Sequence, residues 1–181
     1  MERKFARLRR GSVPEAPDVW VVPSDGMCLS AFLVLRSANE PAKVLLGKIE
    51  PTAAWRDLSA LGPDRVDRLR NLWMLPASQL LLLESPDDAA RRIAREQLGI
   101  ELRELPVPRI FSETASRPGM EGRDPHWDIL FVYELPWTAD TPPTSAAWSQ
   151  LQMVDVSQTS RKEFGRGHSD VLGLVGVDAG P

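Results

Sequence analysis

One stretch, LPASQLLLLESPDDAARRIAREQLGI at residues 75–100, constrains the fold more than any other part of the chain. Its apolar first part is typical of a strand, and Ser85 then supplies an N-cap residue directly before a proline. Proline is well placed at the first helical position, where no backbone donor is needed. Gly99 is suited to end the helix in the left-handed conformation. We therefore predict a strand, a turn and one helix over residues 86–98.

A helical wheel over this segment separates an apolar arc from a basic arc, at about 100° per residue. We expect the apolar arc to pack on a mixed sheet, with Ala90, Ala94 and Leu98 facing inward. On the same wheel Ile93 lies between Glu96 and Gln97. Arg92 and Glu96 are four residues apart, a spacing at which ion pairs form on helix surfaces.

The spacing of the polar residues resembles the Nudix box, the metal and pyrophosphate motif of the Nudix hydrolase family. The pattern is G-x5-E-x7-R-E-U-x-E-E-x-G-U, where U is a bulky aliphatic residue. The matching residues are Glu84, Arg92, Glu96, Gly99 and Ile100. The resemblance extends by element order over residues 27–175.

Four positions of the motif differ from the family pattern, one of them only in size, because Ala94 stands at a bulky aliphatic position. Ser78 stands at the first glycine, Ile93 replaces the glutamate after the arginine, and Gln97 replaces the last glutamate. Because the family's helix carboxylates hold divalent metal, these exchanges remove two negative charges from that face. If they alone limit catalysis, restoring both glutamates should raise hydrolysis by about tenfold or more.

The resemblance implies an α/β protein, a Nudix-like α/β/α sandwich with a mixed β-sheet. It also implies metal-dependent hydrolysis, here weakened or unusual, of a nucleoside diphosphate linked to another group. Glu96 and Glu84 would bind Mg²⁺ or Mn²⁺ weakly, and Arg92 would complete the catalytic set by orienting a glutamate. The alternative is a non-catalytic Nudix-fold module that binds a nucleotide or a protein. Acidic side chains that converge on Glu96 would favour the first interpretation.

The rest of the chain fits the same element order. Hydrophobic alternation and turn residues predict strands at residues 18–22, 27–36, 43–49, 126–135 and 151–156, and one or two strands within 101–114. Residues 72–77 resemble the family's strand before the box, and residues 164–175 resemble its closing helix. Residues 50–71 have loosely helical spacing and form an insertion that shapes a pocket or a dimer contact. We divide the chain into a basic N-terminal arm (1–17), a Nudix-like domain (18–176) and a C-terminal tail (177–181).

Other polar residues are weaker candidates for a site. Residues 115–125 form a Gly/Pro-rich loop, and we take Glu121 and Arg123 from this loop, with His126 after it, as candidate substrate contacts. A zinc site based on histidine would need both His126 and His168, and no spacing supports one. Cys28 lies in the apolar run MCLSAFLVLR, which favours buried packing over a nucleophilic role.

Composition narrows the function classes further. One cysteine among 181 residues excludes an internal disulfide and fits a reducing, cytoplasmic setting. No apolar run approaches the length of a membrane span. A net charge of −3 disfavours general nucleic-acid binding, although the first ten residues are basic and could contact RNA or anionic lipid. We expect a small-molecule nucleotide as the partner and consider a homodimer.

Overall fold

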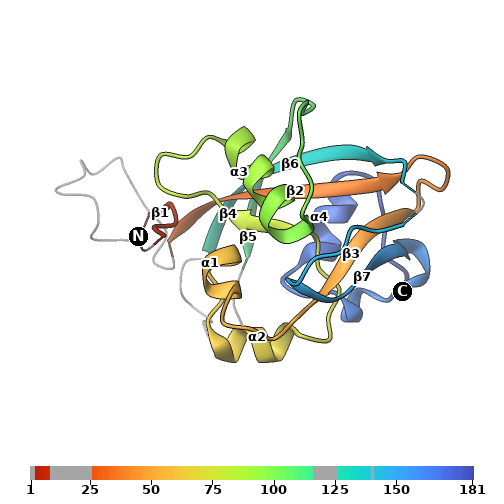
Figure 1. Cartoon of the computed structure of the whole chain (residues 1–181), viewed down its shortest axis with the longest axis horizontal. Coiled ribbons are helices and arrows are strands. Elements are labelled where there is room, and N and C mark those ends of the chain that lie inside the picture. Colours follow the sequence, from red (N-terminus) through yellow and green to blue (C-terminus); the bar gives the residue numbers. More distant parts are fainter. Residues whose placement is uncertain (1–2, 9–25, 116–125, 140) are drawn as a thin grey trace.

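The structure is a computed structural model that describes residues 3–8, 26–115, 126–139 and 141–181 (Figure 1). Its strands are β1 (Arg7–Leu8), β2 (Met27–Ser37), β3 (Lys43–Ile49), β4 (Ala77–Gln79), β5 (Arg109–Ala115), β6 (His126–Trp137) and β7 (Trp148–Asp155). Its helices are α1 (Trp55–Ser59), α2 (Pro63–Leu69), α3 (Pro86–Ile93), the π-helix η1 (Ala94–Leu98), the 3-10 helices η2 (Val156–Gln158) and η3 (Arg161–Glu163), and α4 (His168–Leu174).

All seven strands belong to one mixed sheet, whose main path is β5-β6-β2-β3-β7. The parallel β2–β6 pair runs from Met27 opposite Trp127 to Ser37 opposite Trp137. The other edge of β2 pairs antiparallel with β1, then with β4, and finally with β3 at Arg36. The long central strand β2 thus holds together β1, β4 and the antiparallel β3–β7 pair.

The sheet is covered on both faces, as the alternation along β2 requires. Ala31, Leu33 and Leu35 are buried against the side chains of α3 and η1. Phe32 and Val34 point to the other face and are buried with the apolar side of α4. The predicted α/β/α sandwich with a mixed sheet is therefore confirmed.

A third cluster of buried side chains lies beneath α1 and α2 (Figure 1, yellow and orange). Trp55 is fully buried, its ring packs edge-on against Trp148 with centroids 4.9 Å apart, and its indole N–H donates to the Ala147 carbonyl. Gly47 makes room for this pair, because a Cβ on Gly47 would collide with the Trp148 ring. Residues 50–71 are thus part of the core as well as an insertion in sequence.

Most strand predictions are confirmed within a few residues, with two differences. The predicted strand at 72–77 is wrong in position: residues 73 and 74 make single bridges, and regular pairing begins at Ala77, after Pro76, which has no backbone donor. The predicted strands within 101–114 reduce to β5, because residues 101–108 are irregular. The predicted strand at 18–22 lies outside the described residues.

Both ends of the described chain lie on the domain. The Ala6 amide donates to the Leu80 carbonyl and the Leu82 amide donates to the Lys4 carbonyl, so residues 3–8 pair alongside residues 77–82. Near the C-terminus the Gly180 amide donates to the Val156 carbonyl. The part of the basic arm that the structure describes is therefore held against its own domain by backbone hydrogen bonds.

Candidate functional site

The box helix begins where the sequence predicted. The Ser85 hydroxyl accepts a hydrogen bond from the Asp88 amide at 3.1 Å, and Gly99 ends the helix at φ 70°. Ala90, Ala94 and Leu98 are fully buried, as predicted. After Ile93, however, the backbone changes from α to π, which widens each turn and rotates the following residues away from an α-helical wheel.

Glu84 and Arg92 form a buried pair. Arg92 Nε donates to Glu84 Oε1 at 2.7 Å, and Arg92 Nη2 donates to Glu84 Oε2 at 2.8 Å. The Leu81 amide also donates to Glu84 Oε2 at 2.8 Å, and Arg92 Nη2 reaches the Gln79 carbonyl. Such a bidentate, charge-assisted pair fixes the turn before the helix and occupies both oxygens of this carboxylate.

Glu96 has a different partner from the one that helical spacing suggested. Arg3 Nη1 donates to Glu96 Oε2 at 2.6 Å, and Arg3 Nη2 donates to Glu96 Oε1 at 2.8 Å. Arg3 also donates to the Asp57 carbonyl, so it joins the N-terminal arm to α1 as well. The predicted surface ion pair between Arg92 and Glu96 does not form. Arg92 points toward Glu84 and the Gln79 carbonyl, whereas Glu96 points toward Arg3 near the N-terminus.

The two positions at which the box has lost a glutamate, Ile93 and Gln97, are part of the interior. Ile93 is fully buried among the side chains between α3 and the sheet. Gln97 is 1% exposed, and its amide makes three hydrogen bonds: Oε1 accepts from the Ala77 amide, and Nε2 donates to the carbonyls of Leu58 and Ala77. The expectation that Ile93 lies on a metal-facing surface is therefore wrong, because this side of the helix packs against the sheet.

Mg²⁺ or Mn²⁺ does not fit the box as it is arranged here. A hard divalent ion needs several carboxylate or carbonyl oxygens directed at one point. Glu84 and Glu96 are each held by a different arginine, and Ile93 and Gln97 add no charge. Among the described residues, no group of three acidic, histidine or cysteine side chains gathers around Glu96 at a spacing suited to an ion.

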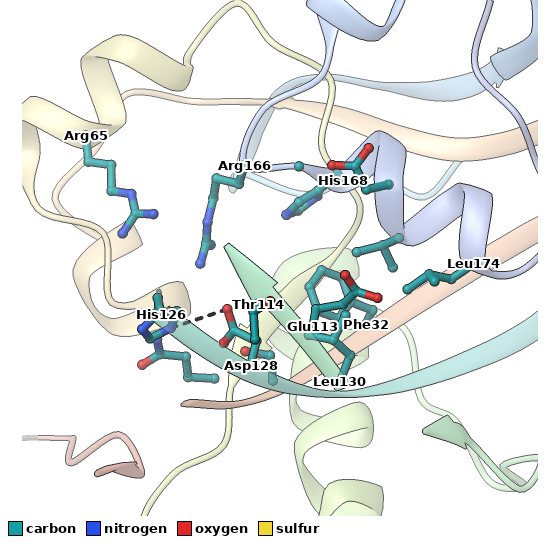
Figure 2. Close-up of a pocket in the computed structure, with 15 residues that line it drawn as sticks. Phe32, Arg65, Glu113, Thr114, His126, Asp128, Leu130, Arg166, His168 and Leu174 are labelled. Carbon is teal, nitrogen blue, oxygen red and sulfur yellow. Dashed lines mark ion pairs between the residues drawn. The ribbon is translucent and has the colours of Figure 1, made fainter. Parts of the chain in front are cut away.

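The other face of the sheet carries a pocket of about 430 Å³ (Figure 2). Its floor is made by alternate side chains of β2 and β6 together with residues of β5, and α4 forms one wall. Figure 2 shows Arg65 and Arg166 on one side of this space, with His126 and Asp128 opposite them. Phe32, Leu130 and Leu174 form an apolar region beside these polar groups.

The two arginines come from separate parts of the chain. Arg65 lies on α2, in the inserted segment, and Arg166 lies directly before α4. Arg166 Nη1 donates to the Ser59 hydroxyl at 3.1 Å, and the Arg166 backbone has φ 57°. A left-handed conformation is unfavourable for a residue with a side chain, and such residues concentrate at ligand sites.

His168 adds an uncharged polar group to this side of the pocket. Its Nδ1 accepts a hydrogen bond from the Leu75 amide at 2.8 Å, which leaves Nε2 as the protonated nitrogen of the neutral ring. Burial, and then the positive charges of Arg166 and Arg65, keep the pKa of His168 well below its ordinary value of 6.5. The ring therefore stays neutral near pH 7 beside two permanent cations.

Of the substrate contacts predicted from the sequence, the structure describes only His126. This residue lines the pocket, and its Nε2 lies 3.3 Å from Asp128 Oδ2. Glu121 and Arg123 lie outside the described residues. Sequence reasoning missed Arg65, Arg166 and His168, and only the GRGH sequence before α4 offered a local signal for two of them.

No protein-family model and no curated protein matches this chain. Solved structures do. A MutT Nudix hydrolase from Burkholderia pseudomallei superposes with a TM-score of 0.54 at 14% identity, over 82% of this chain and 98% of the other. A mMutator MutT protein from Bacillus halodurans also gives a TM-score of 0.54, at 15% identity, over 84% of this chain and 85% of the other.

At sequence identities this low, structural similarity is evidence for a shared fold and not for a shared activity. In the described residues no helix is long and apolar enough to cross a membrane. The sheet order, the box helix on one face and the closing helix on the other are those expected from the resemblance. The chain has the Nudix fold.

Proposed function

We propose that this protein is a non-catalytic nucleotide-binding module built on the Nudix fold. The observation that carries the proposal is the state of the box: both remaining acids are tied to arginines, and both exchanged positions are buried. The helix that would hold metal in a Nudix hydrolase thus acts here as a structural element. Mg²⁺-dependent hydrolysis remains the competing function.

The pocket on the opposite face supports the binding role. Arg65 and Arg166 supply two guanidinium groups, which suit the planar oxygen pairs of phosphates. The neutral His168 ring adds a hydrogen-bond donor, Nε2, and being uncharged it does not repel Arg65 and Arg166. Asp128 and Glu113 lie on the other side, where an anion would be repelled and where hydroxyl or amino groups find acceptors.

The apolar part of the pocket suits the remaining portion of such a ligand. Phe32, Leu130 and Leu174 offer a surface for a base or another flat group. A nucleotide is therefore expected to place its phosphates between the arginines and its base toward these side chains. This orientation follows from charge and polarity alone.

Calorimetric titration with nucleoside mono-, di- and triphosphates tests the proposal. We expect binding without added Mg²⁺, and Arg166→Gln should weaken it by about tenfold or more, equivalent to 1.4 kcal/mol. Arg91→Gln is the matched control, because it removes the same charge from the outer side of α3. Circular dichroism of each variant verifies the fold.

The same samples, incubated with Mg²⁺ or Mn²⁺, distinguish the competing function. The proposal predicts no release of phosphate or nucleoside monophosphate above the rate without protein. Metal-dependent turnover by the wild-type chain would overturn it in favour of a hydrolase whose site uses other acids. Absence of binding to every nucleotide, or an unchanged affinity in Arg166→Gln, would overturn the assignment of the pocket.

A further inference from the structure

A second group of polar side chains lies at the edge of the pocket, and only one of its members, Asp128, has a part in the proposed nucleotide contacts. Cys28 on β2 and Asp128 on β6 are direct partners in the parallel β2–β6 pairing. His126 is two residues before Asp128 and so points to the same face of the sheet. One ligand atom from each of the three residues lies within 4.8 Å of the other two.

We propose that Cys28, His126 and Asp128 form a binding site for Zn²⁺ or a chemically similar cation such as Co²⁺. The proposal does not depend on the proposed nucleotide binding, because these three side chains would hold the ion by themselves. Sulfur and imidazole ligands favour these borderline ions over Mg²⁺, which the box would be expected to take. The three residues are thus the right chemical types for one class of metal.

The geometry is close to what that class requires. Tetrahedral Zn²⁺ with bonds of about 2.0–2.3 Å sets its ligand atoms roughly 3.3–3.8 Å apart. His126 Nε2 and Asp128 Oδ2 are already 3.3 Å apart. All three ligand atoms lie within 4.8 Å of one another, about 1 Å beyond the upper end of that range.

The surroundings of the sulfur hold it in place. Gln79 Nε2 donates to Cys28 Sγ at 3.1 Å, a contact that also fixes where the sulfur points. Hydrogen bonds of this kind to metal ligands orient them and tune the site. Cys28 is 1% exposed, whereas His126 and Asp128 line the pocket. An ion here would have sulfur on its buried side and the pocket on the other.

Three protein ligands leave one tetrahedral position open. Zinc sites of this type keep the fourth position for water or a bound molecule. Here that position faces the pocket, opposite Arg65 and Arg166 (Figure 2). The site therefore takes a small anionic or neutral oxygen donor as its exchangeable ligand.

Titration of the full chain with Co²⁺ tests the site directly. A near-ultraviolet charge-transfer band arises when cobalt binds a thiolate, and Cys28 is the chain's one cysteine, so the band reports this residue alone. We expect one Co²⁺ per chain, displacement by one Zn²⁺, and a dissociation constant in the micromolar range or tighter. Absence of the band at saturating Co²⁺ would overturn the proposal.

Variants locate the ion. Cys28→Ser should abolish the band, and His126→Asn should weaken Zn²⁺ binding by about tenfold or more. Glu40→Gln is the control, because it removes a carboxylate from the turn at the other end of β2. Unchanged Zn²⁺ affinity in folded Cys28→Ser and His126→Asn would show that the ion binds elsewhere.

A measurement on the wild-type chain covers the case in which a buried substitution prevents folding. Zn²⁺ should slow the reaction of Cys28 with a thiol reagent, and Mg²⁺ at the same concentration should not. Equal reaction rates with and without Zn²⁺ would contradict the proposal without any variant.

Discussion

Replacing Gln97 with glutamate restores the last acid of the box pattern, yet the structure predicts that it destabilises the fold. The Gln97 amide donates to two carbonyls, those of Leu58 and Ala77, at 3.2 and 3.0 Å. A carboxylate has no hydrogen to donate, so both bonds are lost. The bond from the Ala77 amide to Oε1 at 3.2 Å survives, because a carboxylate still accepts it.

The magnitude follows from the partners that remain. The Ala77 carbonyl still accepts a hydrogen bond from the Ser59 hydroxyl at 3.0 Å. Losing the bond from Gln97 therefore costs about as much as one ordinary hydrogen bond, about 1 kcal/mol. The Leu58 carbonyl loses a partner in a partly buried position, at a cost of about 1–3 kcal/mol. Gln97→Glu should therefore lower the free energy of unfolding by about 2–4 kcal/mol, a large share of a typical domain's stability.

Urea denaturation at pH 7.5 and pH 5 measures this change. The introduced carboxyl can donate again once it is protonated, so its protonated form is favoured in the folded state. Its destabilising effect should then be smaller at pH 5 than at pH 7.5. Gln97→Met is the control, because it has similar volume and no titrating group, and its effect should not depend on pH.

Two results would refute this reasoning. One is a Gln97→Glu variant as stable as wild type at pH 7.5, which would mean that the amide is not held by these carbonyls. The other is a stable Ile93→Glu, Gln97→Glu double variant with metal-dependent hydrolysis. Because Ile93 is fully buried, we now expect that double variant to unfold instead of gaining activity.

Three further predictions concern other parts of the chain. Gly47→Ala should lower the free energy of unfolding by about 1–3 kcal/mol, measured in urea, because its Cβ would collide with the Trp148 ring. The free energy of unfolding of His168→Asn should fall below that of wild type by a smaller amount at pH 5.5 than at pH 7.5. The low pKa of His168 makes wild-type stability fall as pH drops below 6.5, and asparagine removes that dependence. Arg3→Ala should cost no more than about 1 kcal/mol in the same assay, since its ion pair is partly exposed.

The box helix shows how far sequence reasoning reaches. Its start depends on Ser85 and Pro86 and its end on Gly99, and these are local signals that act within a turn. The inward side of Ala90 and Ala94 follows from the same short-range periodicity. Ala94 and Leu98 are buried as predicted, but the helix type changes after Ile93 to a π-helix, whose different rotation per residue no local residue type announces.

Long-range pairing accounts for what the sequence did not reveal. Arg3 and Glu96 are separated by 93 residues, and helical spacing instead favoured the nearer Arg92. Cys28 and Asp128 meet because β2 and β6 pair in parallel, a register that no motif encodes. A zinc interpretation that required both histidines overlooked a cluster with one histidine, a thiol and a carboxylate.

Gln79 connects the two regions that have been considered for metal. Its carbonyl accepts from Arg92 on the box side of the sheet, and its side chain donates to Cys28 on the pocket side. The Arg92–Glu84 pair is buried and bidentate, so it restricts where β4 lies and hence where the Gln79 amide points. Glu84 and Arg92, two of the box residues that remain, thus have a structural role that needs no metal, because they position the strand that borders the pocket. If this is correct, loss of Arg92 should weaken Zn²⁺ binding at Cys28 although Arg92 touches no metal ligand, whereas loss of Glu96 should leave it unchanged.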